Sequence, residues 1–124
     1  MKLYGLDHSP PTHAVAMTLS VLDIENYHLE IIKEDKIDDI LREFTGTKLN
    51  RHKHVPLLID GHTRLNDSAS IMVHLVEKYG GKSHFLYPAD RPDVRARIDE
   101  RLRFYTGSFW QAAYKTFVRS FLTI

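Results

Sequence analysis

The residues best suited to chemistry form an ordered set along the chain: Ser9, the Val55-Pro56 step and the Asp67-Ser68 pair. Ser9 precedes tandem prolines, and proline suits the first turn of a helix. A serine hydroxyl at a helix N-terminus can stabilise an anion, because the helix dipole adds to its hydrogen bond. The same residue can also be a plain N-cap, and the sequence pattern alone favours that interpretation.

Composition excludes several classes of protein. The chain has 124 residues and no cysteine, so a disulfide framework, a Cys-based zinc site and dithiol redox chemistry are excluded. Any sulfur chemistry must use a thiol that a ligand brings in. The net charge of +1 is too balanced to indicate nucleic acid or an anionic membrane as the main partner.

The N-terminal residues give no export signal, and no apolar stretch approaches the roughly 18 residues that suggest a membrane span. With 43% apolar and 27% charged residues, the chain is typical of a soluble globular protein. We therefore expect a cytoplasmic protein without a membrane or nucleic-acid partner.

The hydrophobic pattern predicts the order β-α-β-α-β-β-α, then a linker and one long helix. We expect strands over residues 2–6, 27–32, 55–59 and 63–66, and helices over residues 12–22, 36–44 and 69–79. Asp60-Gly61 is a hairpin signal between the last two strands. This order predicts a thioredoxin-like α/β domain, with helices on both faces of a four-stranded mixed sheet.

Two of the helices have clear apolar faces. In the first helix, the expected buried residues are Val15, Leu19 and Leu22, widened by Ala14, Met17 and Val21. In the helix over residues 69–79 they are Ile71, Met72, Leu75, Val76 and Tyr79.

Three ordered blocks of the sequence resemble the delta- and epsilon-class cytosolic glutathione transferases of insects. The first block is LYGLDHSPPTHAVAMTL, which is similar to the opening of these proteins. The second is HVPLLIDGHTRLNDSASIMVHLVEKYG, similar to their strand, hairpin and third helix. The third is LYPADRPDVRARIDERLRF, similar to their linker and fourth helix.

The resemblance implies a thioredoxin-like glutathione-binding domain over residues 1–81, a linker over 82–91, and the first helix of a truncated all-helical C-terminal domain over 92–124. It implies a transferase that conjugates glutathione to hydrophobic electrophiles in detoxification, with glutathione as co-substrate, no metal, and a homodimer as the usual state. The alternative is a catalytically weak or inactive module that binds glutathione or dimerises. A thiol-disulfide oxidoreductase shares the fold but needs a cysteine, and Ser9 stands in its place.

The family's site can be carried over to the matching positions. By the resemblance, Ser9 matches the family's catalytic serine, which keeps the glutathione thiolate anionic. This role is needed because a free thiol has a pKa of ~8.5 and only its thiolate is the nucleophile. The backbone of Val55, before a cis bond to Pro56, would pair with the ligand's cysteinyl backbone. Asp67 and Ser68 would hold the γ-glutamyl end. An ordinary strand-entry proline and a plain N-cap are the simpler alternatives.

The glycyl end of the ligand is where the sequence departs most from the family. The family usually has a histidine three residues before the proline, and Lys53 stands there between His52 and His54. Lys53 or His54 would attract the glycyl carboxylate, lysine acting as a point charge. A His-x-His metal pair and a solvated loop are the alternatives. Ala69 stands where the family commonly has Arg or His, and His13 stands where Arg or another residue is common.

The long helix is rich in aromatic residues. Tyr105 and Phe109 could line a co-substrate pocket, or could simply pack in a core or interface. An apolar patch is expected on this helix because its aromatic residues cannot all face one side. They are Phe104, Tyr105, Phe109, Trp110, Tyr114, Phe117 and Phe121.

Overall fold

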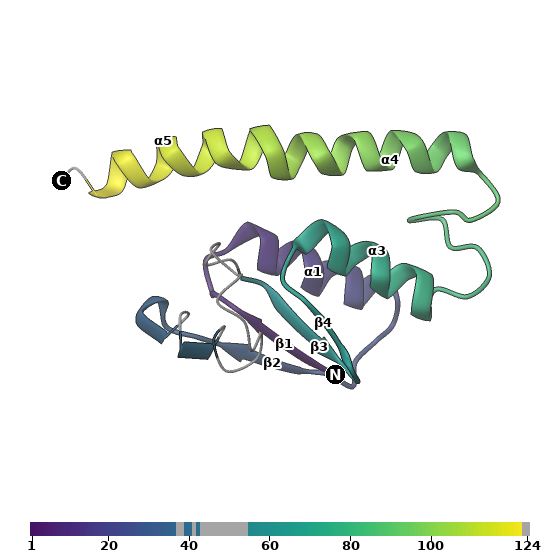
Figure 1. Cartoon of the computed structure of the whole chain (residues 1–124), viewed down its shortest axis with the longest axis horizontal. Coiled ribbons are helices and arrows are strands. Elements are labelled where there is room, and N and C mark those ends of the chain that lie inside the picture. The colour runs from purple at the N-terminus through teal and green to yellow at the C-terminus, as the bar shows by residue number, and fades with distance from the viewer. Residues whose placement is uncertain (37–38, 41, 43–54, 123–124) are drawn as a thin grey trace. The chain divides into compact units, whose positions relative to one another are not determined.

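The computed structural model describes residues 1–36, 39–40, 42 and 55–122 of the chain (Figure 1). It divides into two compact units, Met1–Gly81 and Lys82–Ile124. The first unit contains the sheet and the helices packed on it, and the second is mainly helical.

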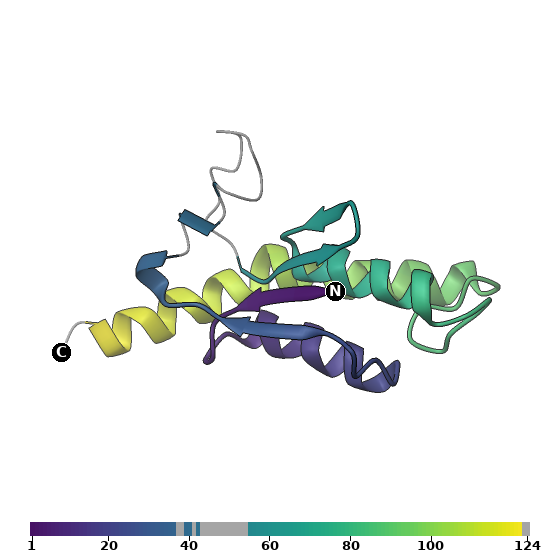
Figure 2. The same cartoon turned by 90° about the horizontal axis from the view of Figure 1, so that it is seen from below.

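The first unit is built on a four-stranded mixed sheet, as predicted. Its strands are β1 (Lys2–Gly5), β2 (His28–Ile31), β3 (Leu57–Asp60) and β4 (Thr63–Leu65), in the spatial order β2-β1-β3-β4. Figure 2 shows β1 between β2 and β3. β1 and β2 run parallel, whereas β1 with β3 and β3 with β4 run antiparallel.

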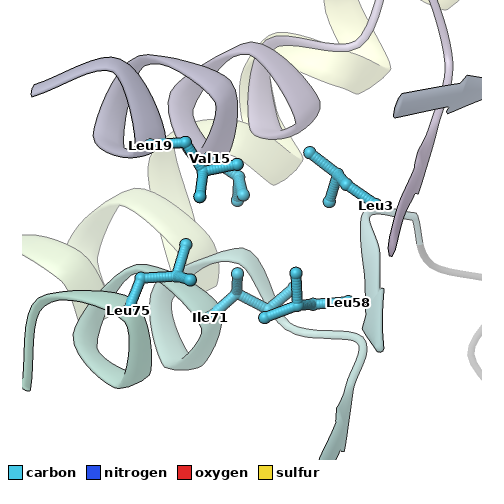
Figure 3. Packing of buried hydrophobic residues seen from close by; sticks show 6 residues of the cluster. All are labelled: Leu3, Val15, Leu19, Leu58, Ile71 and Leu75. Carbon is cyan, nitrogen blue, oxygen red and sulfur yellow. The ribbon is translucent and has the colours of Figure 1, made fainter. Parts of the chain in front are cut away.

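One face of the sheet is covered by two helices, α1 (Pro10–Val21) and α3 (Ser68–Tyr79), which lie side by side (Figure 1). The main core fills the space between them and the strands. Each fully buried aliphatic side chain there contributes about 1.5–3 kcal/mol relative to its exposure to water. The core residues, all 0% exposed, are Leu3, Val15, Leu19, Leu58, Ile71 and Leu75 (Figure 3).

The other face has a smaller cluster of buried Tyr4, Ile32 and Leu57, with Ile40 and Val55 packed against it. The helix predicted over residues 36–44 falls mostly outside the described residues, and a 3₁₀ turn, Glu34–Lys36, precedes it. The parallel β1–β2 pair joined through α1, followed by the β3–β4 hairpin and α3, confirms the thioredoxin-like prediction.

Two residues predicted on the buried face of the first helix are exposed, Met17 by 68% and Val21 by 46%. The prediction is wrong because Val15 and Leu19 define the face that meets the sheet. Met17 and Val21 each follow one of these by two positions, which is about 200° around a helix. They therefore point away from the core.

The second unit contains a helix that runs through α4 (Pro92–Phe104), a π-helical turn η2 (Tyr105–Phe109) and α5 (Trp110–Leu122). Figure 1 shows α4 and α5 as one continuous rod, which confirms the predicted long helix. The π turn was not predicted. The hydroxyl of Tyr87 donates to Asp99 at 2.8 Å and the guanidinium of Arg95 lies 4.1 Å from the Tyr87 ring, so the segment before α4 is fastened to it.

No helix within the described residues is long and apolar enough to cross a membrane.

Candidate functional site

Ser9 is the N-cap of α1. Its backbone is extended, with φ −91° and ψ 111°, and Oγ accepts a hydrogen bond from the amide of Thr12 at 3.4 Å. The residue is 8% exposed. Within the described residues Oγ has no other hydrogen-bond partner, so its own proton is not committed to an acceptor there.

The two prolines after Ser9 reduce the number of backbone amide donors at the start of α1. Pro10 and Pro11 occupy the first helical positions and have no N–H. The amide of Ser9 donates to the carbonyl of Leu6 at 3.2 Å, and that of His13 to the carbonyl of Ser9 at 3.1 Å. The N–H of Thr12 is therefore the one amide of this turn that bonds to a side chain, and it points at the serine oxygen.

The Val55-Pro56 peptide bond is cis, which confirms the sequence expectation. Pro56 is buried and Val55 is half-buried, immediately before β3. Within the described residues the backbone of Val55 makes no hydrogen bond outside the β3 ladder, which begins at Leu57.

Asp67 is the N-cap of α3, so the capping interpretation is confirmed. Its Oδ2 accepts hydrogen bonds from the amide of Ser70 at 2.8 Å and from Oγ of Ser70 at 2.7 Å. Ser68 is 6% exposed, and within the described residues its hydroxyl makes no hydrogen bond. No side-chain oxygen of the described residues is both sealed from solvent and unpaired, so Oγ of Ser68 remains accessible.

The sheet topology brings these three sites to one end of the sheet. Tyr4, near the end of β1, pairs with Leu57 at the start of β3, and Leu58 pairs with Leu65 at the end of β4. Because neighbouring strands in this part of the sheet are antiparallel, β1 and β4 finish where β3 begins. Ser9, Val55 and Asp67 each lie only a few residues from one of these strand ends.

The predicted contacts to the glycyl end of a ligand, Lys53 and His54, lie outside the described residues, as does His52. Their roles stay predictions.

A family model described as the N-terminal domain of glutathione S-transferase matches residues 3–83. The chain belongs to the glutathione S-transferase family. "Glutathione S-transferase 1" of Manduca sexta is 39% identical over 115 residues, which cover 90% of this chain and 50% of that protein. The predicted resemblance to insect glutathione transferases is thus confirmed.

Solved structures agree with this assignment. A Bombyx mori glutathione transferase matches with a TM-score of 0.81 and 33% identity, over 99% of this chain and 55% of the other. A glutathione transferase homolog from Drosophila mojavensis, solved with bound glutathione, matches with a TM-score of 0.71 and 37% identity, over 86% and 46% of the two chains. The chain spans about half the length of the curated relatives it matches.

The structure also contains a buried charge cluster that the sequence did not predict. Asp60, at the end of β3, is 6% exposed and accepts hydrogen bonds from Nζ of Lys78 at 2.8 Å, Nε2 of His74 at 2.9 Å and the hydroxyl of Tyr79 at 2.8 Å. Burial raises the pKa of this carboxyl group, but the hydrogen bonds from Lys78, His74 and Tyr79 outweigh it and lower the pKa to about 2. The cluster holds α3 against the sheet by hydrogen bonds. It therefore also helps to position Asp67 and Ser68 at the start of α3.

Tyr79 was predicted on the apolar face of its helix, but its ring is 40% exposed and its hydroxyl serves Asp60. The prediction failed because an aromatic ring with a polar tip can lie at the edge of a core. The sequence shows only that His74 and Lys78 are four residues apart on one helix and that Tyr79 follows Lys78, and it does not connect these residues to Asp60.

The aromatic residues of the second unit surround the π turn. The ring of Tyr105 lies 6.1 Å from that of Phe109 and 6.5 Å from that of Trp110, and burial raises the pKa of the Tyr105 hydroxyl. The predicted apolar patch is confirmed within the described residues, since Phe104, Phe109, Tyr114 and Phe117 are all more than half exposed. Whether Tyr105 and Phe109 line a co-substrate pocket stays a prediction.

Proposed function

We propose that this chain binds glutathione at the sheet end where Ser9, Val55 and the start of α3 meet, and that Ser9 keeps the glutathione thiol anionic for attack on a hydrophobic electrophile. The observation that carries the proposal is the state of the Ser9 hydroxyl. It stands at a helix N-terminus, accepts one hydrogen bond from Thr12, and within the described residues donates none.

The two capping side chains differ in a way that supports a second role for Ser9. Asp67 caps α3 at 2.8 Å, whereas Oγ of Ser9 lies 3.4 Å from the amide of Thr12. The longer distance is beyond the usual range for an N–H···O bond, so Ser9 is a weaker cap. A serine hydroxyl that is held in place but still able to donate is suited to a thiolate, whose charge a fixed donor stabilises.

The rest of the tripeptide would be held by groups that flank Ser9. The backbone of Val55 would pair with the cysteinyl residue in the manner of an added strand. The accessible hydroxyl of Ser68 and the carboxylate of Asp67 would receive the γ-glutamyl carboxylate and ammonium groups, respectively. Lys53 or His54 would attract the glycyl carboxylate. Support comes from the Drosophila mojavensis homolog, whose structure holds glutathione.

The same proposal assigns roles along the chain. Residues 1–81 form the glutathione-binding domain, residues 82–91 a linker, and residues 92–124 the first helix of an all-helical domain. Tyr105 and Phe109 contribute to the site of the hydrophobic electrophile, and the functional unit is a cytoplasmic homodimer. The aromatic contacts around the π turn support the electrophile site.

The test is conjugation of a chromogenic electrophile by the natural chain, by Ser9→Ala and by a control, Ser20→Ala. Ser20 is exposed near the other end of the same helix. Loss of the donor in Ser9→Ala is expected to lower kcat on the order of 10²-fold, as for an oxyanion-hole donor, with Ser20→Ala unchanged. Equal rates for the natural chain and Ser9→Ala would refute the catalytic role.

A second candidate function is a module that binds glutathione without turning it over. Ala69 favours it, because the first turn of α3 has no basic side chain for the anionic tripeptide. Calorimetry with glutathione, run beside the conjugation assay, separates the two candidates. Binding without conjugation supports the module, and binding with conjugation supports the enzyme.

A further inference from the structure

The side chain of Thr12 occupies the space that a side chain on Gly5 would need. A Cβ atom placed on Gly5 would lie 2.2 Å from Cγ2 of Thr12 and 2.7 Å from its Oγ1. Thr12 is 1% exposed. Because real Cβ atoms do not approach other atoms so closely, the start of α1 can lie this near the end of β1 only with glycine at residue 5.

Thr12 also connects the two ends of the turn that carries Ser9. Its Oγ1 accepts a hydrogen bond from the amide of Leu6 at 3.4 Å, and its own amide donates to Oγ of Ser9 at 3.4 Å. Pro10 and Pro11 supply no amide donors, so no other N–H of this turn can orient the serine oxygen. Both hydrogen bonds are long, so the close approach of the threonine side chain to Gly5 is a further restraint on this turn.

We propose that Thr12 is a positioning residue for Ser9: seated on Gly5 and bonded to Leu6, it fixes the first turn of α1 so that its amide is directed at Oγ of Ser9. This inference rests on the proposed function, because Ser9 must act on a ligand thiolate for its position to affect a reaction. A misplacement of about 1 Å can cost on the order of 10²-fold in rate. The position in which this turn holds Oγ of Ser9 would therefore affect the reaction directly.

The first test does not need glutathione. The chain has no cysteine, so Ser9→Cys introduces a single thiol at the cap of α1, whose pKa can be measured from the pH dependence of its alkylation by iodoacetamide. A thiol at a helix N-terminus is expected to titrate below the ~8.5 of a free thiol. Adding Thr12→Ala should return the pKa of this thiol toward the free value and lower alkylation at pH 7 several-fold.

Thr18→Ala in the same Ser9→Cys background is the matched control. Thr18 lies in the same helix, is 8% exposed, and donates from Oγ1 to the carbonyl of Ala14 at 3.0 Å. It therefore loses the same atoms from a buried site one and a half turns away, and is expected to leave the pKa of the thiol unchanged. The same pKa in both threonine variants would overturn the inference, because general loosening of the helix would then explain both.

The second test uses the natural Ser9 and the conjugation assay. Gly5→Ala should lower kcat by about 10²-fold, because its methyl group pushes the first turn of α1 away from β1. In the double variant Gly5→Ala/Thr12→Ala the nearest remaining contact is the Cβ of residue 12, at 3.0 Å, which is still tight, so the added cost of Gly5→Ala should fall but not vanish. A Gly5→Ala cost that persists undiminished in the Thr12→Ala background contradicts the inference.

These outcomes separate the inference from the proposed function. Full activity in Ser9→Ala refutes the proposed function, whereas loss in Ser9→Ala with full activity in Gly5→Ala refutes only the positioning role. If Gly5→Ala does not fold, as judged by circular dichroism, the thiol measurement on Thr12→Ala and Thr18→Ala decides the question.

Discussion

Nζ of Lys78, on the last turn of α3, lies 2.8 Å from Oδ2 of Asp60 at the end of β3. The carboxylate is almost fully buried, whereas the lysine side chain is 44% exposed. The pair joins the C-terminal part of α3 to the β3–β4 hairpin. The opposite end of α3 carries Asp67 and Ser68, so the stability of this contact bears on the proposed glutathione site.

We expect Asp60→Asn to lower the free energy of unfolding by about 1–3 kcal/mol, the usual effect of removing one partner from a buried hydrogen-bonded group. Urea unfolding followed by circular dichroism measures this change. Asp93→Asn is the control, because the Asp93–Arg91 pair is exposed on both sides and is expected to contribute little to stability. Equal effects of the two substitutions would show that the Asp60 cluster adds nothing beyond a surface ion pair.

The same carboxylate predicts how stability depends on pH. The folded pKa of Asp60 is lowered to about 2 from an ordinary 3.8, so the folded state binds fewer protons between these values. Its contribution is therefore complete above pH 3.8 and is lost as the pH falls toward 2. The shift corresponds to about 2 kcal/mol.

The test is the difference in unfolding free energy between the natural chain and Asp60→Asn from pH 5 to pH 2. Other acidic groups are common to both proteins and largely cancel. The difference should shrink by about 2 kcal/mol across this range. A difference that stays constant with pH would mean that the pKa of Asp60 is not lowered by folding.

The spacing of apolar residues along each segment was enough to predict most of the helices and strands. In α3, Ile71 and Leu75 recur at helical spacing and both are fully buried. This spacing could not predict how many residues on each helix are buried, because that depends on which other elements pack against the helix. Met17 and Val21 are apolar, yet they lie on the side of α1 that points away from the core, and no described part of the first unit covers them.

The Asp60 cluster shows a different limit of the sequence. Its partners lie 14 to 19 residues away, and only the fold brings them together. The Asp60-Gly61 pair is typical of a hairpin turn, and this interpretation gave no reason to expect that Asp60 also accepts hydrogen bonds from α3. The π turn at Tyr105–Phe109 is likewise a matter of backbone hydrogen bonding that the aromatic pattern did not reveal.

The candidate site was predictable to a different degree. Spacing alone gave Ser9 and Asp67 only as helix caps, and the structure shows both as caps. The expectation of a cis bond before Pro56 came from the family resemblance, because no local pattern distinguishes it from an ordinary strand-entry proline. The sheet topology, which no local pattern reveals, brings these residues to one end of the sheet.

The capping and binding roles of Asp67 can be separated by two substitutions. Asp67→Ala removes the acceptor for the amide of Ser70 and is expected to cost about 1 kcal/mol of stability as well as ligand affinity. Asp67→Asn keeps an oxygen that can cap α3 but removes the negative charge. It should leave stability within about 0.5 kcal/mol, because Asn and Asp are similar caps.

Calorimetry with glutathione completes this prediction. Hydrogen bonds to a charged group exceed neutral ones by about 1 kcal/mol, so Asp67→Asn should bind glutathione about 5-fold more weakly than the natural chain. Affinity that is unchanged in Asp67→Asn would limit this residue to its cap.

Gly61 and Gly107 both lie in open surroundings but differ in backbone conformation. Neither Gly61 nor Gly107 has an atom within 4 Å of the position of an added Cβ. Gly61, in the β3–β4 turn, has φ 60°, a left-handed conformation that costs other residues roughly 1–2 kcal/mol. Gly107 lies within the long helix at a negative φ, where alanine is favoured over glycine by about 0.5–1 kcal/mol.

We therefore expect Gly61→Ala to lower stability and Gly107→Ala to raise it, although both methyl groups enter open space. Thermal unfolding reports the first change, and slower amide hydrogen exchange over residues 105–111 reports the second. Neither substitution creates a contact. If both changed stability in the same direction, backbone conformation would not explain why glycine occupies these two positions. Opposite signs would show that the turn requires a glycine at residue 61 and that the π turn has no such requirement at residue 107.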